Sequence, residues 1–166
     1  MATKFSDIPQ WDSVDNQGAG TAVADISGDG RPDLVVLRVD SRPERNRGFY
    51  RIGWSLDADG EVTGGWSPWF EVPDWFPWQN EGADIAVADV GGRPALVVLM
   101  VDAPEGRNRG FYRIGRALDT AGEITGGWSP WAEVPDWFTW FNQVAGLAVA
   151  EFGGRPELVV LMVDEP

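Results

Sequence analysis

The chain has 166 residues, of which 43% are hydrophobic, so it is long and apolar enough to bury the core of one ordinary domain. Its formal net charge of −13 would repel the phosphates of nucleic acids and of anionic lipid headgroups, so neither is an expected partner. The absence of cysteine and histidine removes disulfides, thiolate and imidazole metal sites, and the commonest general base.

The N-terminal sequence MATKFSDIPQ has neither the basic region nor the apolar run of a signal peptide. No apolar run in the chain approaches the roughly 20 residues that a membrane span requires. We therefore expect a soluble chain without membrane insertion. The sequence does not indicate its cellular location.

Short apolar segments follow one another in a fixed order. The first unit contains TAVADI at 21–26, DLVVLRVD at 33–40, RGFYRIG at 47–53 and the cassette GGWSPWFEVPDWF at 64–76. Their Val, Ile and aromatic residues, separated by Gly, Pro, Asp and Asn, predict strands joined by turns, with WSPW as a fourth strand. The run LVVL predicts a strand buried on both faces, whereas the alternating FYRIGWSLD should lie nearer to solvent.

The same order returns after 62 residues, as Leu34, Leu96 and Leu158 show. Four strands in a repeat of about 60 residues are typical of a β-propeller blade. We therefore expect an all-β fold of four-stranded antiparallel blades, with a β-prism or trefoil-like fold as the alternative. The expected boundaries are 1–19 for the last strand of a partial blade, 20–81 for the first blade, 82–143 for the second, and 144–166 for a C-terminal half-blade.

The segment DISGDGRPDLVVL, from Asp25 to Leu37, resembles the FG-GAP or VCBS repeat of integrin-alpha-like β-propellers. The segments that begin at Asp89 and Glu151 are similar to it more weakly. The resemblance implies a calcium loop between the first two strands of a blade, and calcium prefers six to eight oxygen ligands. The implied ligands are the side chains of Asp25, Ser27, Asp29 and Asp33 and the backbone carbonyl of Arg31.

The two later turns depart from this pattern. They are two residues shorter, and Ala95 takes the place of Asp33 in the second repeat. Calcium is therefore expected in the first repeat alone. A polar turn whose acids are solvated is the alternative reading of Asp25 to Asp33.

Both ends of the chain align with the interior of a repeat. Residues 7–11 align with 71–75, at the end of a blade's last strand, and the chain finishes after the second strand of a third unit. Propellers need at least about four blades, and an open stack exposes strand edges and apolar faces. The expected partner is another copy in a head-to-tail homo-oligomer, a dimer or a trimer. A piece of a longer propeller is the alternative.

The ten tryptophans suggest a lectin-like binding module. Aromatic faces stack on sugar rings, charged side chains bond the hydroxyls, and tandem weak sites gain avidity. Packing between blades is the competing role of these aromatic residues, and a structural or adhesion scaffold that binds a protein through its loops is the alternative function. The expected ligand-binding residues are Arg47, Tyr50, Trp66, Trp69, Trp75, Arg109, Tyr112, Trp128, Trp131 and Trp137.

An enzyme would have to use carboxylate pairs, such as Glu71 with Asp74 or Glu133 with Asp136. Both pairs recur with the repeat, as residues that build a blade do, whereas an active site usually breaks internal symmetry. The sequence therefore predicts a protein that is not an enzyme.

Overall fold

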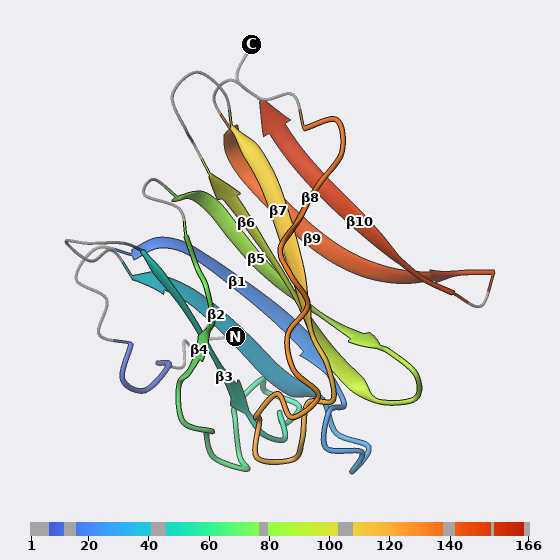
Figure 1. The fold of residues 1–166 in the computed structure, drawn as a ribbon. Helices are drawn as coiled ribbons and strands as arrows, with labels where there is room; N and C mark the ends of the chain where they lie inside the picture. The colour runs from blue at the N-terminus through green and yellow to red at the C-terminus, as the bar shows by residue number, and fades with distance from the viewer. Residues whose placement is uncertain are drawn as a thin grey trace.

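The computed structural model describes residues 7–11, 16–40, 46–76, 80–102, 108–137, 142–153 and 155–164. Within these ranges every regular element is a β-strand, and the strands form three antiparallel sheets that stack side by side (Figure 1). The predicted all-β class is confirmed. In the same ranges there is no helix of the length and apolarity that a membrane crossing requires.

Two of the sheets have the same topology. The first sheet has the strand order β1-β2-β3-β4, and the second repeats it as β5-β6-β7-β8. The first sheet consists of β1 (Asn16–Ala24), β2 (Asp33–Asp40), β3 (Arg47–Gly53) and β4 (Phe70–Val72). The second sheet consists of β5 (Asn80–Asp89), β6 (Pro94–Asp102), β7 (Arg109–Gly115) and β8 (Ala132–Glu133). The third sheet pairs β9 (Asn142–Phe152) with β10 (Arg155–Asp164).

The strand register repeats with the sequence. Leu34 of β2 lies opposite Gly53 of β3, and Leu96 of β6 lies opposite Gly115 of β7, which are the same positions 62 residues later. The sequence repeat is therefore also a repeat of strand pairing.

The fourth strand begins later than the cassette suggests. In the first repeat, Trp66 makes only an isolated bridge to Gly53, and β4 starts at Phe70. Pro68 lies between the two and has no backbone N–H to donate to a ladder, so the WSPW segment cannot pair as a continuous strand. The second repeat behaves in the same way.

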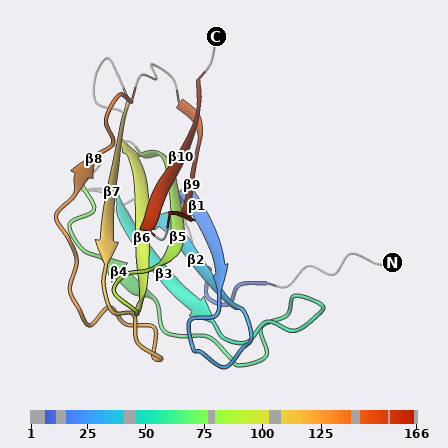
Figure 2. The same cartoon turned by 90° about the vertical axis from the view of Figure 1, so that its right-hand side faces the viewer.

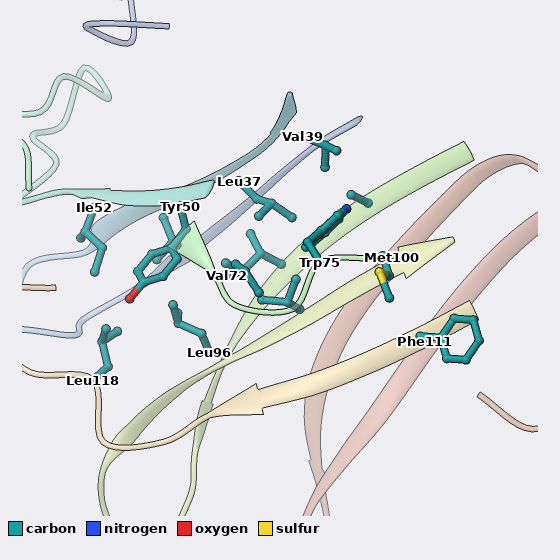
Figure 3. Packing of buried hydrophobic residues seen from close by; sticks show 14 of the residues in the cluster. Leu37, Val39, Tyr50, Ile52, Val72, Trp75, Leu96, Met100, Phe111 and Leu118 are labelled. Carbon is teal, nitrogen blue, oxygen red and sulfur yellow. The ribbon is translucent and has the colours of Figure 1, made fainter. Parts of the chain in front are cut away.

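The main core lies between the first and second sheets. Figure 3 shows Leu37 and Tyr50 of the first sheet near Leu96 and Met100 of the second, with Trp75 between the two sheets. A smaller core between the second and third sheets contains Leu99, Val101 and Trp137, against which Ala145, Leu147 and Val160 pack.

The expectation that FYRIGWSLD lies near solvent is wrong for its first half. Tyr50 and Ile52 are buried, because residues 117–127 of the second repeat fold back over this part of the first sheet. Leu118 joins the same core, and a Cβ placed on Gly122 would lie 3.3 Å from the Cδ1 atom of Ile52. The alternation of the sequence could not reveal a cover that comes from the next repeat.

Residues 7–11 make the same contacts on the first sheet that residues 71–75 make on the second. Arg51 donates to the Pro9 carbonyl oxygen, and Arg113, its equivalent, donates to the Pro73 carbonyl oxygen. The N-terminal segment therefore takes the place of the end of a preceding β4-type strand.

The inner strands β1, β5 and β9 pack closely through one carboxylate. Gly20, Asp84 and Gly146 are equivalent positions, since they lie opposite Leu37, Leu99 and Leu161. Asp84 Oδ2 accepts the Leu147 N–H of β9 at 2.7 Å, and Asp84 Oδ1 accepts the Ile85 N–H at 2.8 Å. The Thr21 backbone of β1 also bonds this carboxylate. Asp84 therefore connects all three sheets.

We expect Gly20→Ala to destabilise the protein by about 1–3 kcal/mol, because the space next to Gly20 is filled. A Cβ on Gly20 would lie 2.4 Å from Asp84 Oδ1 and 2.6 Å from Asp84 Cα, so backbone would have to move. The matched control is Gly146→Ala, whose Cβ would meet its nearest atom at 3.6 Å. The free energy of unfolding of this variant should lie within about 0.5 kcal/mol of the wild-type value or above it. Urea unfolding measures both, and equal losses would contradict this packing.

Burial raises the pKa of Asp84, although backbone hydrogen bonds from Leu147, Ile85 and Thr21 oppose the shift. The folded state then binds the proton more tightly than the unfolded state, so this group's contribution to stability is greatest below the unfolded pKa and is lost as the pH rises through the folded pKa. We therefore expect the free energy of unfolding of wild type, relative to Asp84→Asn, to fall between pH 4 and pH 7. Urea unfolding over this range tests the slope, and a difference that grows with pH would show that the shift has the opposite sign.

Candidate functional site

The turn from Asp25 to Asp33 connects β1 to β2 and is held by carboxylate hydrogen bonds to the backbone. Asp25 accepts the N–H groups of Gly28 at 2.8 Å and Gly30 at 3.0 Å, one on each oxygen. Asp29 Oδ1 accepts the Arg31 N–H at 2.8 Å, and this bond lowers the pKa of Asp29. The exposed part of the turn is therefore ordered by Asx-type bonds.

Asp33 is fully buried at the base of this turn. Its Oδ2 accepts the N–H groups of Ile26 at 2.9 Å and Ser27 at 3.0 Å, and its Oδ1 accepts the Ser55 N–H at 2.8 Å. The hydroxyl of Ser55 also donates to Asp29 Oδ2 at 3.2 Å. Asp33 thus fastens the turn to the segment that follows β3.

The implied calcium ligands are all oxygen donors, which is the chemistry that calcium prefers. In the described parts of the chain, however, no group of three or more acidic side chains is arranged to hold a metal ion. Calcium binding would have to compete with the backbone N–H groups that Asp25, Asp29 and Asp33 already bond. The Ser27 hydroxyl is buried beside the Asp29 carboxylate, whose pKa it helps to lower, and Arg31 is exposed. The calcium site therefore stays a prediction.

The second turn, from Asp89 to Pro94, is closed without an acid in the Asp33 position. The Gly92 N–H bonds Asp89 Oδ1 at 2.7 Å, and the Val90 N–H bonds the Arg93 carbonyl at 2.9 Å. Ala95, at the position of Asp33, is fully buried. A shorter turn can satisfy its own backbone and leave an apolar residue at its base.

The arginines of the repeats stack on the tryptophans of the cassettes. The Arg51 guanidinium carbon lies 4.9 Å from the Trp66 ring centre and 5.2 Å from that of Trp69. Arg113 lies 5.3 Å from Trp128 and 5.2 Å from Trp131 in the same way. These distances are those of cation–π pairs, and burial lowers the pKa of both arginines.

The same two arginines also donate hydrogen bonds to backbone carbonyl oxygens. Arg51 donates to Ser67 at 2.7 Å, and Arg113 donates to Ser129 at 2.7 Å. With their stacked faces and their bonds to Pro9 and Pro73, these groups hold together the outer strands and the segment before each sheet. Trp66, Trp69, Trp128 and Trp131 are partly buried in this arrangement.

Three of the expected ligand-binding aromatic residues are core residues in the structure. Trp75 is 1% exposed, Trp137 3% and Tyr50 2%, so their ring faces do not form a platform for a ligand. Burial also raises the pKa of Tyr50 well above its usual range. The Trp75 and Trp137 rings pack on Gly48 and Gly110, where a Cβ would come within 2.3 Å of each ring.

The expected cation Arg47 is committed to a neighbouring acid. It donates to both carboxylate oxygens of Glu71, with the Nε to Oε1 distance at 2.8 Å, and this pairing raises the pKa of Arg47. Its guanidinium carbon also lies 5.0 Å from the Phe49 ring centre. In the second repeat, Arg109 and Glu133 are the equivalents of Arg47 and Glu71. Arg109 forms an ion pair with Asp102, with 3.8 Å between Arg109 Nη2 and Asp102 Oδ2.

An aromatic cluster with one exposed ring lies at the junction of the first and second sheets. Phe76 is 39% exposed, and its ring lies 5.2 Å from Phe111 and 6.0 Å from Trp131, edge-on to both. The Arg109 guanidinium carbon lies 5.2 Å from the Phe111 ring centre. We call Phe76, Phe111, Trp131 and Arg109 the junction cluster. Asp102 adds a carboxylate beside it.

The structure places Arg109 against Phe111 and Trp131 against Phe76, on either side of the Phe76–Phe111 pair, but it places Tyr112 apart from them. Tyr112 follows Phe111 in β7, so its side chain points to the opposite face of the second sheet. Sequence reasoning did not single out Phe76, although it directly follows the buried Trp75 in the cassette. The sequence signal for Phe76 is its position: when the core buries one of two adjacent aromatic residues, here Trp75, the other is free to face solvent. Trp78 and Trp140 lie outside the described residues.

No family model matches the chain, and neither a curated protein nor a solved structure matches it. The similarity of Asp25 to Leu37 to FG-GAP repeats therefore remains a resemblance.

If the first turn binds calcium, the ion should raise the melting temperature of wild type by about 2–4 °C for each kcal/mol of binding free energy. Asp29→Ala should abolish this rise. Asp29 is preferred to Asp33 for the test because Asp33 is buried and holds three N–H groups. Asp89→Ala is the control, since it removes an acid from the second turn and should leave the calcium response unchanged. Melting curves that are identical with and without calcium would remove the site.

Proposed function

We propose that this chain is a non-catalytic, lectin-like module that binds a glycan at the junction cluster. The observation that carries the proposal is the exposure of Phe76 beside two further aromatic rings and an arginine. Most other large aromatic side chains of the cassettes are stacked or buried. Among the described residues Phe76 is the one aromatic side chain that is exposed, and together with the rings beside it this side chain forms an apolar patch of the kind that binding surfaces use.

The junction cluster has the chemistry that sugar recognition uses. A pyranose presents an apolar face of C–H groups, which packs on an aromatic ring, and a rim of hydroxyls, which need donors and acceptors. Phe76 and Trp131 supply apolar surface, Arg109 supplies N–H donors, and Asp102 supplies an acceptor. A neutral glycan also agrees with the net charge of −13, which disfavours anionic ligands.

We also propose the propeller arrangement for the stacked sheets. Two sheets have four antiparallel strands in meander order, and the first strand of each packs against the first strand of the next. This is how blades are placed around a central axis, with β1, β5 and β9 innermost. Junctions between blades would then recur around the ring, and sites at these junctions would gain avidity together.

The acid pairs support a non-catalytic module. Glu71 is bound to Arg47, and the Asp74 side chain is 84% exposed, 3.8 Å from Arg113. An acid pair that cleaves a glycosidic bond has to flank the bound substrate in a site that excludes water, and the exposed Asp74 is not in such a site.

A structural or adhesion scaffold that binds a protein through its loops is the alternative function. The burial of Trp75 and Trp137 and the stacking of the cassette tryptophans on Arg51 and Arg113 favour it, because these residues then build the fold and bind no ligand.

A glycan array with folded protein separates the two functions. We expect binding that free sugar competes away, and we expect Phe76→Ala to weaken the best ligand by about tenfold, equal to about 1.4 kcal/mol, because a stacking surface is lost. Arg93→Ala is the control, since Arg93 is exposed in the turn at the other end of β6 from Asp102. A blank array with intact protein would favour the scaffold.

A further inference from the structure

Each sheet of the stack has a front, which faces the preceding sheet, and a back, which faces the following one. The back of the first sheet meets the front of the second in the main core, and the back of the second meets the front of the third in the smaller core. The back of the first sheet contributes Val35, Leu37 and Val39, and the front of the second contributes Ile85, Leu96, Val98 and Met100. The chain therefore makes one kind of contact twice.

The back of the third sheet has no sheet packed on it among the described residues. Val159 is 46% exposed and Leu161 58% exposed on β10. Their equivalents on β6 are Val97 and Leu99, which are 3% and 0% exposed because the third sheet covers them. The run LVVL was expected to be buried on both faces, and β2 and β6 fulfil this expectation, whereas β10 does not.

The complementary free face is the β1 side of the front of the first sheet; among the described residues no sheet packs on it, although Val36 of the neighbouring β2 is buried. Val23 of β1 is 59% exposed, whereas its equivalent Val87 of β5 packs into the main core. Thr21, the equivalent of the buried Ile85, is also exposed. Figure 1 shows β5 and β6 between β1 and β10, which places the two free faces at the two ends of the stack, and Figure 2 views the stack from the end that carries β10.

The front of the first sheet already carries the start of such a contact. Residues 7–11 lie on it as residues 71–75 lie on the front of the second sheet. Trp11 meets Trp69 edge-on at 5.8 Å, and Trp75 meets Trp131 edge-on at 5.6 Å. Residues 71–75 come from the end of β4, which belongs to the sheet that precedes the second sheet in the stack. Because residues 7–11 make the equivalent contacts, the front of the first sheet has the form that receives a preceding sheet.

We infer that the back of the third sheet of one copy docks on the front of the first sheet of a second copy. The occupant follows from the repeat, because the two free faces are the two halves of a contact that the chain makes twice within itself. Each face complements the other and not itself, so the contact is heterologous and head-to-tail, and its repetition gives a ring when the rotation between copies closes. Val159 and Leu161 of one copy then cover Thr21 and Val23 of the next. This inference extends the propeller arrangement and does not depend on glycan binding.

The test uses two variants that block one face each, Leu161→Glu and Val23→Glu. Both side chains are exposed, so neither charge should disturb the folded single chain. Light scattering after size exclusion should give a multiple of 18.2 kDa for wild type and 18.2 kDa for each variant alone. A mixture of the two variants should recover a dimer, because Val23 of the first and Leu161 of the second form one intact contact.

Ala121→Glu is the matched control, because it places the same charge on an exposed residue of a turn that lies on neither free face. This variant should keep the mass of wild type. A wild-type chain that remains a folded monomer at all concentrations would overturn the inference. An assembly that Leu161→Glu leaves intact, or a mixture that stays monomeric, would overturn it as well, since the contact would then lie elsewhere or would be symmetric. No sugar enters these measurements, so their failure is distinct from a blank glycan array.

Discussion

The carboxylate of Asp84 lies where the inner strands of three sheets meet, and its two oxygens bond backbone on both sides. It holds Leu147 of β9 and Thr21 of β1 while it belongs to β5 itself. The Asp84 side chain fits there because glycine stands at the equivalent position of β1, where a Cβ on Gly20 would lie 2.4 Å from Asp84 Oδ1. The spacing of the stack, and with it both cores, depends on this one polar contact. Its acceptor atoms are satisfied, which offsets the cost of removing a charge from water.

The Trp-rich cassettes fasten one repeat to the next. Arg51 and Arg113 each combine two stacked indole faces with bonds to backbone carbonyls from an adjacent segment. This explains why the cassettes are nearly identical in the two repeats, since each makes the same contacts with its arginine and with the adjacent segment. It also explains why so few of their aromatic rings are open. Phe76 is left over because the core already uses the Trp75 ring beside it.

A stack of this kind is stabilised between nearest neighbours, as in other repeat architectures. The second sheet has a neighbour on each face, and its β6 residues Val97 and Leu99 are buried. Among the described residues the third sheet has a neighbour on one face, and the equivalent β10 residues Val159 and Leu161 are exposed. The same sequence pattern therefore has two different environments, and the proposed contact between copies would make them alike.

The sequence by itself determined the strands, the repeat and the turns. Alternation, β-branched runs and Gly-rich or Asp-rich turns are local, and the 62-residue spacing returned as a repeat of strand register from Leu34 to Leu96. The sequence also predicted Arg109 and Trp131 as ligand-binding residues, and both belong to the junction cluster. Only the tertiary structure decided which aromatic side chains are buried, since Trp75 and Tyr50 are covered by residues of the next repeat and Phe76 is not. The same holds for Asp84, whose partners Thr21 and Leu147 lie 63 residues away on either side, where no local pattern reaches.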